Sequence, residues 1–422
     1  MNAASAIYQN NDRVFTPLGS KCKQCSFYKE SDDSPDFKSG FNECWQNATG
    51  LKLLDRPLVT ELWNGLAGKK SFATELVKIN KHFLDQVEEV DITSKSNTKN
   101  SSLGLTPLER RMEQINRIKK NTTESYFDAD GLKGEMESWR FPLHMIDFET
   151  SSVAIPFFKG LHPYEGIAFQ FSHHTIDENW NIKHATQYIS FESGTFPNFE
   201  FANQLMQALS KDKGTIFRYH NHENTYLNFI CRQLQVHPNA PTNKNEIIAF
   251  IDEITHDKKT ERSGQRDMVD LYDLVLKYYY PPKAKGSNSL KQILPAIIFD
   301  SEFLKTKYGR NGIYGKGMEV ESLNFDDHLW ISPDKNNNPY KTLPRVFEEY
   351  DPEILDSLVK DFENLADGGA AMTAYNYLQF SEIPPDQRER IRDSLYRYCE
   401  LDTMAMVMLL EGWNEMITSS NK

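Results

Sequence analysis

Four acidic residues and one tyrosine stand at positions where they could build a site for divalent metal ions. Asp147 and Glu149 lie two residues apart in the apolar run "HMIDFET" at 144–150. Side chains two apart on a strand point to the same face, so the run predicts a buried strand with two neighbouring carboxylates. Because like charges repel and their burial costs free energy, either this face meets water or a cation lies between the two acids.

Three further residues complete the set. Glu223 follows the strand-like run "GTIFRYHN" at 214–221, at a junction between a strand and a helix. Tyr398 and Asp402 stand four apart within a long predicted helix, so both project from one helix face. Mg²⁺ and Mn²⁺ prefer carboxylate oxygens, and two such ions about 3.5–4 Å apart can clamp the attacking and leaving oxygens of a phosphodiester. The four carboxylates are therefore expected to hold two Mg²⁺ or Mn²⁺ ions, while the tyrosine orients the attacking water.

The same residues also allow a purely structural interpretation. Asp147 and Glu149 would then be an exposed pair on a strand, Glu223 an acid favoured by the helix dipole, and Tyr398 a core residue. The motifs D-x-E and Y-x-x-x-D each occur by chance in many proteins. It is their order along the chain, on elements of the expected types, that favours the metal site.

The segments that carry these residues predict an α/β fold. Three strand-like runs follow one another: "FPLHMIDFET", "EGIAFQFSHHTI" and "HATQYISF". Helices and one further strand then alternate, which is typical of a mixed sheet flanked by helices. A segment at 299–345 is rich in aromatic residues and glycine and has weak periodicity. The predicted helices lie near 197–212, 223–236, 244–257, 268–279, 287–297, 352–366 and 386–417.

The chain upstream of the first strand is predicted to form smaller regions. Residues 1–66 are polar and irregular, and residues 68–92 have helical periodicity. After a Ser- and Asn-rich loop, Thr106 and Glu109 predict a capping box that starts a basic helix, whose charges are expected to face solvent. We divide the chain into a Cys-containing N-terminal region at 1–66, a helical linker region at 67–137 and an α/β domain at 138–422 with an insertion near 299–385.

Composition limits the classes of protein that fit. The chain has 422 residues, of which 39% are hydrophobic and 26% charged, and no apolar run long enough to span a membrane. The N-terminus lacks the basic and apolar regions of a signal peptide, so we expect a soluble cytoplasmic protein. A net charge of −12 argues against a large nucleic-acid footprint but leaves room for a local grip on a few nucleotides.

Three cysteines near the N-terminus have the spacing of an incomplete metal knuckle. Cys22-x-x-Cys25 is followed by Cys44, whereas structural zinc sites and iron–sulfur clusters usually take four ligands. Either a histidine or a partner protein supplies the fourth ligand to Zn²⁺ or a cluster, or no metal binds here. Cys231 and Cys399 lie within predicted helices and are expected to be core thiols.

Two histidine pairs are further candidates for the site. His173 and His174 lie in the second predicted strand, and His220 and His222 flank the junction before Glu223. They could ligate metal or contact phosphate, or they could be ordinary histidines at strand ends. His173 and His220 are retained as expected contacts to substrate.

The acidic motifs resemble those of a known superfamily. "IDFET", the acid of "YHNHE" and "YCELD" are similar to the motifs of the DEDD 3′–5′ exonucleases, which have the ribonuclease H-like fold, and Y-x-x-x-D matches the tyrosine branch. The resemblance implies that Asp147, Glu149, Glu223 and Asp402 are metal ligands and that Tyr398 positions the water. Glu223 departs from the pattern, because the third acid is usually Asp. Its extra methylene moves the carboxylate by about 1 Å, which could weaken one ion site.

A closer resemblance covers most of the chain. Segments such as "FRYHNHENTYLNFI", "YYYPPKAKGSNSLKQILPA" and "YCELDTMAM" resemble a bacterial family described as a domain of unknown function, which is placed among ribonuclease H-like nucleases. That family carries the three N-terminal cysteines after a nuclease domain with a four-cysteine iron–sulfur cluster, and only 21 residues precede Cys22 here. The resemblance implies a cleft lined by Tyr164, Gln170, His173, Asp270, Ser289 and Lys291.

These observations predict a metal-dependent 3′–5′ exonuclease that acts on single-stranded DNA or RNA by a two-metal mechanism. One alternative is an endonuclease with the same acids, although the spacing from Tyr398 to Asp402 favours end-trimming. The other alternative is a catalytically weak nucleic-acid-binding or assembly subunit of a defence or repair complex. Glu223 and the incomplete cysteine set favour that alternative, in which a protein partner binds the N-terminal region.

Overall fold

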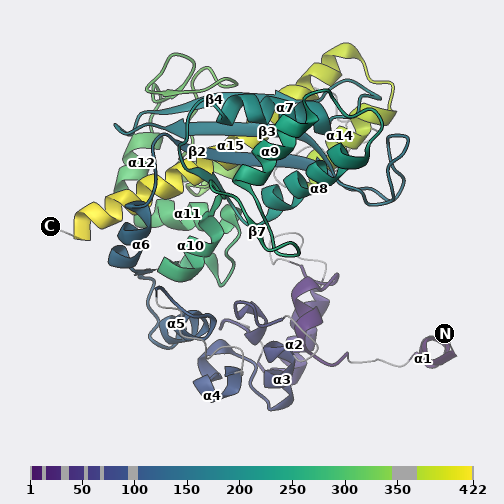
Figure 1. Ribbon diagram of the computed structural model, residues 1–422. Coiled ribbons are helices and arrows are strands. Elements are labelled where there is room, and N and C mark those ends of the chain that lie inside the picture. Colours follow the sequence, from purple (N-terminus) through teal and green to yellow (C-terminus); the bar gives the residue numbers. More distant parts are fainter. Residues whose placement is uncertain are drawn as a thin grey trace. The chain divides into compact units, whose positions relative to one another are not determined.

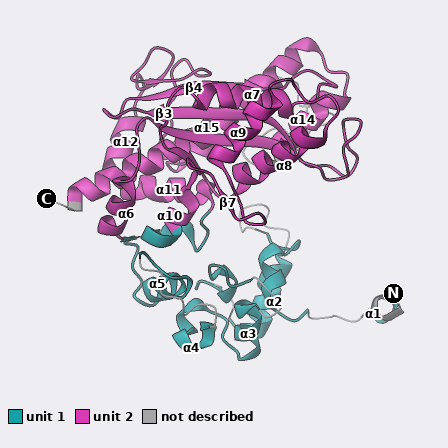
Figure 2. Cartoon of the chain, viewed as in Figure 1, with its two compact units in different colours: residues 1–127, 276–288 teal, residues 128–275, 289–422 magenta. Residues whose placement is uncertain are grey.

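The computed structural model describes residues 2–11, 16–29, 38–51, 56–66, 71–93, 103–344 and 368–420. The chain forms two compact units (Figure 2). Unit 1 contains residues 1–127 and 276–288, and unit 2 contains residues 128–275 and 289–422. The helix predicted at 352–366 lies outside the described residues. Among the residues that are described, no helix is both long and apolar enough to cross a membrane.

Unit 1 is built from short helices. The helical periodicity at 68–92 corresponds to two short helices among the described residues: α3 ends at Lys78, and the left-handed backbone of Asn80 (φ 60°) follows it. A separate turn then forms, in which the Gln86 side chain accepts hydrogen bonds from the backbone of His82 and Phe83. The helices of this unit are α1 (Asn2–Asn10), α2 (Gly40–Thr49), α3 (Phe72–Lys78), α4 (Glu89–Ile92) and α5 (Pro107–Lys119).

The start of α5 follows the prediction, but its charges do not. Thr106 and Glu109 form the capping box, with the Glu109 carboxylate accepting from the Thr106 backbone at 2.8 Å. Arg110 and Arg111, however, are buried rather than solvated. The Arg110 guanidinium donates to the carbonyls of Leu276 at 3.0 Å and Tyr279 at 2.9 Å. These bonds explain why residues 276–288 belong to unit 1, where β9 (Tyr279–Tyr280) also pairs with β1 (Tyr126–Phe127).

Unit 2 is a mixed α/β structure around a sheet that, in the described part of the chain, has seven strands. The strands β2 and β3, and likewise β3 and β4, are antiparallel, whereas the other neighbours are parallel. The order across the sheet is β10 (Tyr314–Gly315), β11 (Val320–Glu321), β4 (Ile182–Ile189), β3 (Ile167–Ile176), β2 (Leu143–Ser151), β5 (Ile216–Arg218) and β8 (Val269–Asp270). The α/β class predicted from the sequence is confirmed.

The two faces of the sheet differ in chemistry because side chains alternate along each strand. Ile146 and Phe148 of β2 join an apolar core with α7 (Asn198–Leu209), α8 (His222–Val236) and α9 (Lys244–Ile254). The intervening Asp147 and Glu149 face the other side, where α15 (Pro385–Ser420) contacts β2 and β3 (Figure 1). Cross-strand partners of these acids, Ser172 and Gln170, bond to α15.

Smaller elements complete unit 2. An antiparallel hairpin of β6 (His256–Asp257) and β7 (Arg262–Ser263) follows α9. The weakly periodic region after residue 299 contains α12 and the two short strands β10 and β11. The remaining helices of this part are α6 (Ala129–Met136), α11 (Leu290–Asp300), α12 (Glu302–Tyr308) and α14 (Gly368–Phe380). Another helix, α10 (Leu271–Tyr278), begins in unit 2, and its residues from 276 onward belong to unit 1.

Candidate metal centre

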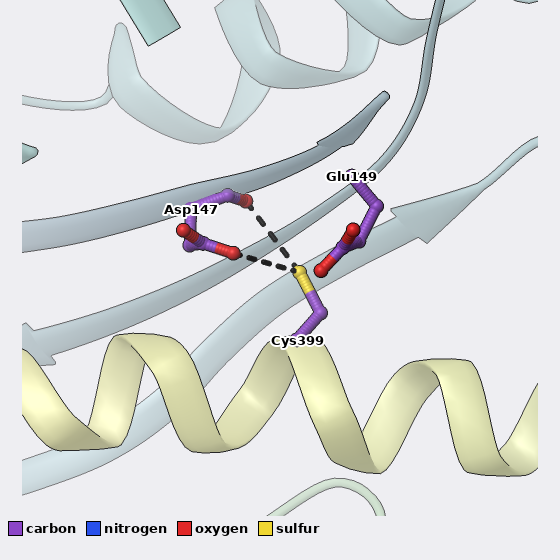
Figure 3. A group of neighbouring side chains, drawn as sticks. All are labelled: Asp147, Glu149 and Cys399. Carbon is purple, nitrogen blue, oxygen red and sulfur yellow. Dashed lines mark hydrogen bonds between the residues drawn. The ribbon is translucent and has the colours of Figure 1, made fainter. Parts of the chain in front are cut away.

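The centre begins where β2 meets α15. Asp147 and Glu149 project from β2 toward the helix, and Cys399 projects from α15 toward both (Figure 3). The Cys399 Sγ lies 3.6 Å from Asp147 Oδ2 and 3.6 Å from the Asp147 carbonyl oxygen. One ligand atom from each of the three residues lies within 4.8 Å of the others. Segments that are 252 residues apart in the chain therefore bring three metal-ligating side chains together.

Glu223 adds a buried carboxylate from the start of α8. It is the second residue of that helix, and its side chain is 2% exposed. Within the described residues, its Oε2 atom has no hydrogen-bond partner. Burial is the main cause that raises the pKa of Glu223 to about 8. A backbone hydrogen bond and the charge of Arg218 oppose this effect, and the charges of Asp270 and Asp402 add to it.

Asp402 is held by two tyrosines. The Tyr340 hydroxyl donates to Asp402 Oδ1 at 2.5 Å, and Tyr398 also hydrogen-bonds to this carboxylate. Burial raises the pKa of Asp402, while these hydrogen bonds and the charge of Lys291 lower it in part. Lys291 Nζ lies 5.3 Å from the ring centre of Tyr398 and 5.7 Å from that of Tyr340.

Electrostatics link all four predicted acids. Withdrawal from water raises the pKa of Asp147 well above its usual value, and Asp402, Glu223 and Glu149 raise it further. The mutual repulsion of these acids when they ionise, together with the unpartnered Glu223 oxygen, is what a divalent cation would compensate. The donor set fits Mg²⁺ or Mn²⁺, since both prefer carboxylate oxygens. Asp147, Glu149, Glu223 and Asp402 are the residues that would hold such ions.

Tyr398 lies among the acids as the sequence predicts. Its side chain is 2% exposed, and burial raises the pKa of its phenol well above the usual value, followed by the charges of Asp402 and Glu149. The phenol is therefore protonated at neutral pH and can donate a hydrogen bond. It cannot serve as a general base.

Some expected cleft residues lie near the acids. Gln170 is the register partner of Glu149, and its Nε2 donates to the Leu395 carbonyl at 2.8 Å. Asp270 accepts from the Arg218 guanidinium at 2.5 Å and from the His220 backbone at 2.8 Å. Both oxygens of the Asp270 carboxylate therefore accept hydrogen bonds, and its charge acts on Glu223. Lys291 lies beside the two tyrosines that bond Asp402.

The prediction that His173 lines the same cleft is contradicted by the register of β3. His173 pairs with Ile146, which faces the apolar core, so its ring lies on the opposite side of the sheet from Asp147. There its Nε2 lies 2.9 Å from His144 Nδ1, and its Nδ1 lies 2.9 Å from the Thr186 hydroxyl. The buried pair of His144 and His173 is therefore separated from the acids by the sheet.

Three other expected contacts lie outside the acid cluster. Tyr164 is 68% exposed in the loop after β2, where its backbone N–H bonds to Val153 at 2.8 Å. The His220 side chain is exposed and packs edge-on against Tyr272, with ring centres 4.8 Å apart. Ser289 is exposed at the N-terminal end of α11.

Sequence reasoning missed two members of the site. Tyr340 lies in a short turn of the weakly periodic region, so no pattern marked it. Cys399 was expected to be a core thiol, and it is buried, but its sulfur lies beside the carboxylates of Asp147 and Glu149. Its position three residues before Asp402 places the two on the same side of the helix, a signal that could have identified it. Cys231, by contrast, belongs to the apolar core as expected.

The N-terminal cysteines gather in unit 1. Cys22, Cys25 and Cys44 line a surface pocket of about 660 Å³ beside Trp45. Burial raises the pKa of the Cys22 thiol, and the charges of Cys25 and Cys44 add to this effect. Where side chains are described, the close group of three metal-ligating atoms is the one around Asp147, and the three sulfurs do not form a second.

Comparison with models of known protein families gives a match over part of the chain. The model of a family described as "Domain of unknown function (DUF2779)" matches residues 144–289. This range begins in β2 and ends just before α11, so it includes Asp147, Glu149 and Glu223 but neither Tyr398 nor Asp402. No curated protein and no solved structure matches the chain. About a third of the chain, from β2 to the start of α11, is therefore similar to that family of unknown function.

Proposed function

We propose that the chain is a metal-dependent nuclease, a 3′–5′ exonuclease that hydrolyses terminal phosphodiester bonds of DNA or RNA. The main support is the meeting of the D-x-E pair on β2 with the Y-x-x-x-D motif on α15, where Asp147 Oδ2 lies 3.6 Å from Cys399 Sγ. If the two motifs occurred by chance, the fold would have no reason to bring them together. The buried, unpartnered oxygen of Glu223 adds a fourth carboxylate from a third segment.

The sheet supports a ribonuclease H-like core as part of this proposal. β2 lies inside a mixed sheet, between antiparallel β3 and parallel β5, and helices flank both faces. Its acids therefore have a rigid support on both sides. Catalytic groups on regular elements hold their geometry better than groups on loops.

In this proposal the side chains divide the work. Asp147, Glu149, Glu223 and Asp402 would hold two Mg²⁺ or Mn²⁺ ions, which when bound supply charge neutralisation at a phosphodiester. Tyr398, protonated and hydrogen-bonded to Asp402, would orient the attacking water by accepting a hydrogen bond from it. Lys291 brings a positive charge to the edge of the acid cluster, where it can contact a phosphate of the substrate strand.

Calorimetric titration with Mn²⁺ tests the ion site directly. Binding to the intact chain that is lost in Asp147→Ala supports the proposal. Binding that is insensitive to this change, or no binding at all, would favour a nucleic-acid-binding or assembly subunit instead. Reaction products then separate the two nuclease alternatives, because mononucleotides mean end-trimming and internal fragments mean an endonuclease.

A further inference from the structure

A thiol stands inside the candidate metal centre without a role in the proposed reaction. Cys399 is fully buried, and its sulfur lies 3.6 Å from Asp147 Oδ2. Figure 3 shows the side chain pointing from α15 toward the carboxylates of Asp147 and Glu149. The other buried cysteine, Cys231, packs among apolar side chains of α7, α8 and α9. The two thiols are therefore in opposite chemical surroundings.

A second, independent observation points to cation binding at this centre. Glu223 is 2% exposed, and its Oε2 atom is an acceptor for which the described residues provide no donor. A buried carboxylate oxygen without a donor is costly unless a cation or an ordered group meets it. Glu223 comes from α8 and not from the helix that carries Cys399, so the two observations do not depend on each other.

We propose that Cys399 is a sulfur ligand of one of the ions at this centre, which makes the centre selective for borderline and soft divalent ions over Mg²⁺. Thiolate sulfur binds Zn²⁺ and Cd²⁺ strongly and Mn²⁺ more weakly, whereas Mg²⁺ strongly prefers oxygen ligands. The thiol binds as the thiolate, so its proton passes to the solvent when the ion enters. The inference rests on the proposed function only in taking the four acids as the remaining ligands.

A sulfur ligand would change which metal ion supports the proposed nuclease activity. A site for two metal ions that is formed only by carboxylates suits Mg²⁺, the ion that two-metal phosphodiesterases commonly use. A sulfur ligand shifts the preference toward Mn²⁺, and it makes Zn²⁺ or Cd²⁺ a tight occupant that excludes the working ion. The alternative is that Cys399 only donates a weak hydrogen bond to Asp147, in which case its removal leaves ion affinity unchanged.

The test is a titration of the full-length chain with Cd²⁺. Changing Cys22, Cys25 and Cys44 to serine removes the other accessible sulfur ligands and gives the parent. Ultraviolet absorption reports the charge-transfer band of a thiolate bound to Cd²⁺, and calorimetry gives the affinity. The variants are Cys399→Ser and, as the matched control for loss of a buried thiol, Cys231→Ser. If the triple substitution unfolds unit 1, Cys399→Ser is compared with Cys231→Ser in the otherwise unchanged chain. A smaller band in Cys399→Ser alone then supports the sulfur ligand, and equal bands overturn it.

The parent and Cys231→Ser are expected to show the band. Cys399→Ser should lose it and bind Cd²⁺ at least about tenfold more weakly, the lower end of what loss of even an outer partner costs a metal site. A parent without the band, or Cys399→Ser with unchanged Cd²⁺ affinity, overturns the sulfur ligand. Mn²⁺ calorimetry distinguishes the two proposals. If Mn²⁺ still binds in an Asp147-dependent way, the ion centre stands without the thiol, whereas a chain that binds neither ion defeats both.

Discussion

The hydroxyl of Tyr340 donates a 2.5 Å hydrogen bond to the carboxylate of Asp402, and both groups are buried. This bond ties a turn of the weakly periodic region to α15 across 62 residues of sequence. It also fixes the direction of the last acid of the candidate centre. The bound carboxylate oxygen is occupied by the phenol, so the geometry of Asp402 toward an ion depends on Tyr340.

Changing Tyr340→Phe should therefore affect both stability and ion binding. Loss of a buried hydrogen bond to a charged group is expected to cost about 1.5–3 kcal/mol of unfolding free energy. Mn²⁺ affinity should fall by about tenfold, because the orientation of Asp402 is no longer fixed. Thermal unfolding and calorimetry measure the two effects.

Tyr308→Phe is the matched control, since Tyr308 donates a bond of the same length, 2.5 Å, to Glu411 elsewhere on α15. It should cost similar stability and leave Mn²⁺ affinity unchanged. Equal effects of both variants on Mn²⁺ affinity would mean that Tyr340 has no specific part in the centre.

Stability without metal should depend on pH through Glu223. The pKa of this residue is raised from 4.5 in the unfolded chain to about 8 in the folded chain, chiefly by burial. A raised carboxyl pKa gives stability that is complete below pH 4.5 and is lost as pH rises through 8. In EDTA, the free energy of unfolding should fall by at least about 2 kcal/mol between pH 5 and 8.

Glu223→Gln should flatten this dependence, because the amide does not ionise. At pH 8 the variant is expected to unfold at a temperature about 4–8 °C higher than the unchanged chain in EDTA. Thermal scans at several pH values measure this. A variant with the same slope as the unchanged chain would show that Glu223 is not the responsible group.

Divalent ions should reverse this destabilisation. Mn²⁺ at a hundred times its dissociation constant stabilises the folded state by about 2.7 kcal/mol, which corresponds to about 5–10 °C in a domain of this size. EDTA should abolish the increase, and so should Asp147→Asn. Glu411→Gln changes a buried acid of α15 that pairs with Lys307 instead, so it should retain the Mn²⁺ response. A response that survives Asp147→Asn would place the ion elsewhere.

Lys291 is expected to act on substrate rather than on the ions. Replacement by Met removes the positive charge beside Tyr340 and Tyr398 but keeps an apolar chain of similar length. Binding of a single-stranded oligonucleotide in Ca²⁺ or EDTA should weaken by about five- to tenfold, while Mn²⁺ affinity rises slightly because a competing cation is gone. Lys305→Met, which removes an exposed ion pair with Glu302, is the control. Weaker binding by both variants to the same degree would indicate a general effect of charge.

Local patterns made much of unit 2 predictable. Alternation and β-branched residues located β2, β3 and β4, and helical periodicity located α8 and α15 to within a few residues. The spacing between Asp147 and Glu149 predicted a shared face, and that prediction is confirmed, because α15 covers both. These features depend on near neighbours in the chain, which is why sequence suffices for them.

Features that depend on register or on distant contacts could not be predicted. His173 is adjacent in sequence to residues of the acid face, but only the pairing of β3 with β2 decides that it lies opposite Ile146. The bond between Tyr340 and Asp402 joins segments whose approach no local pattern encodes. Arg110 appeared to belong to a solvated basic helix, whereas its partners come from residues 276–288, far along the chain.

The most direct test of the account is a degradation assay. The purified chain is incubated with 5′-labelled single-stranded DNA and RNA in Mg²⁺, Mn²⁺ or EDTA, beside Asp147→Ala and Asp402→Ala. The account predicts a metal-dependent ladder that shortens from the 3′ end and is absent in EDTA and in both variants. Intact substrate in every lane, or a ladder that persists in Asp147→Ala and Asp402→Ala, would contradict it.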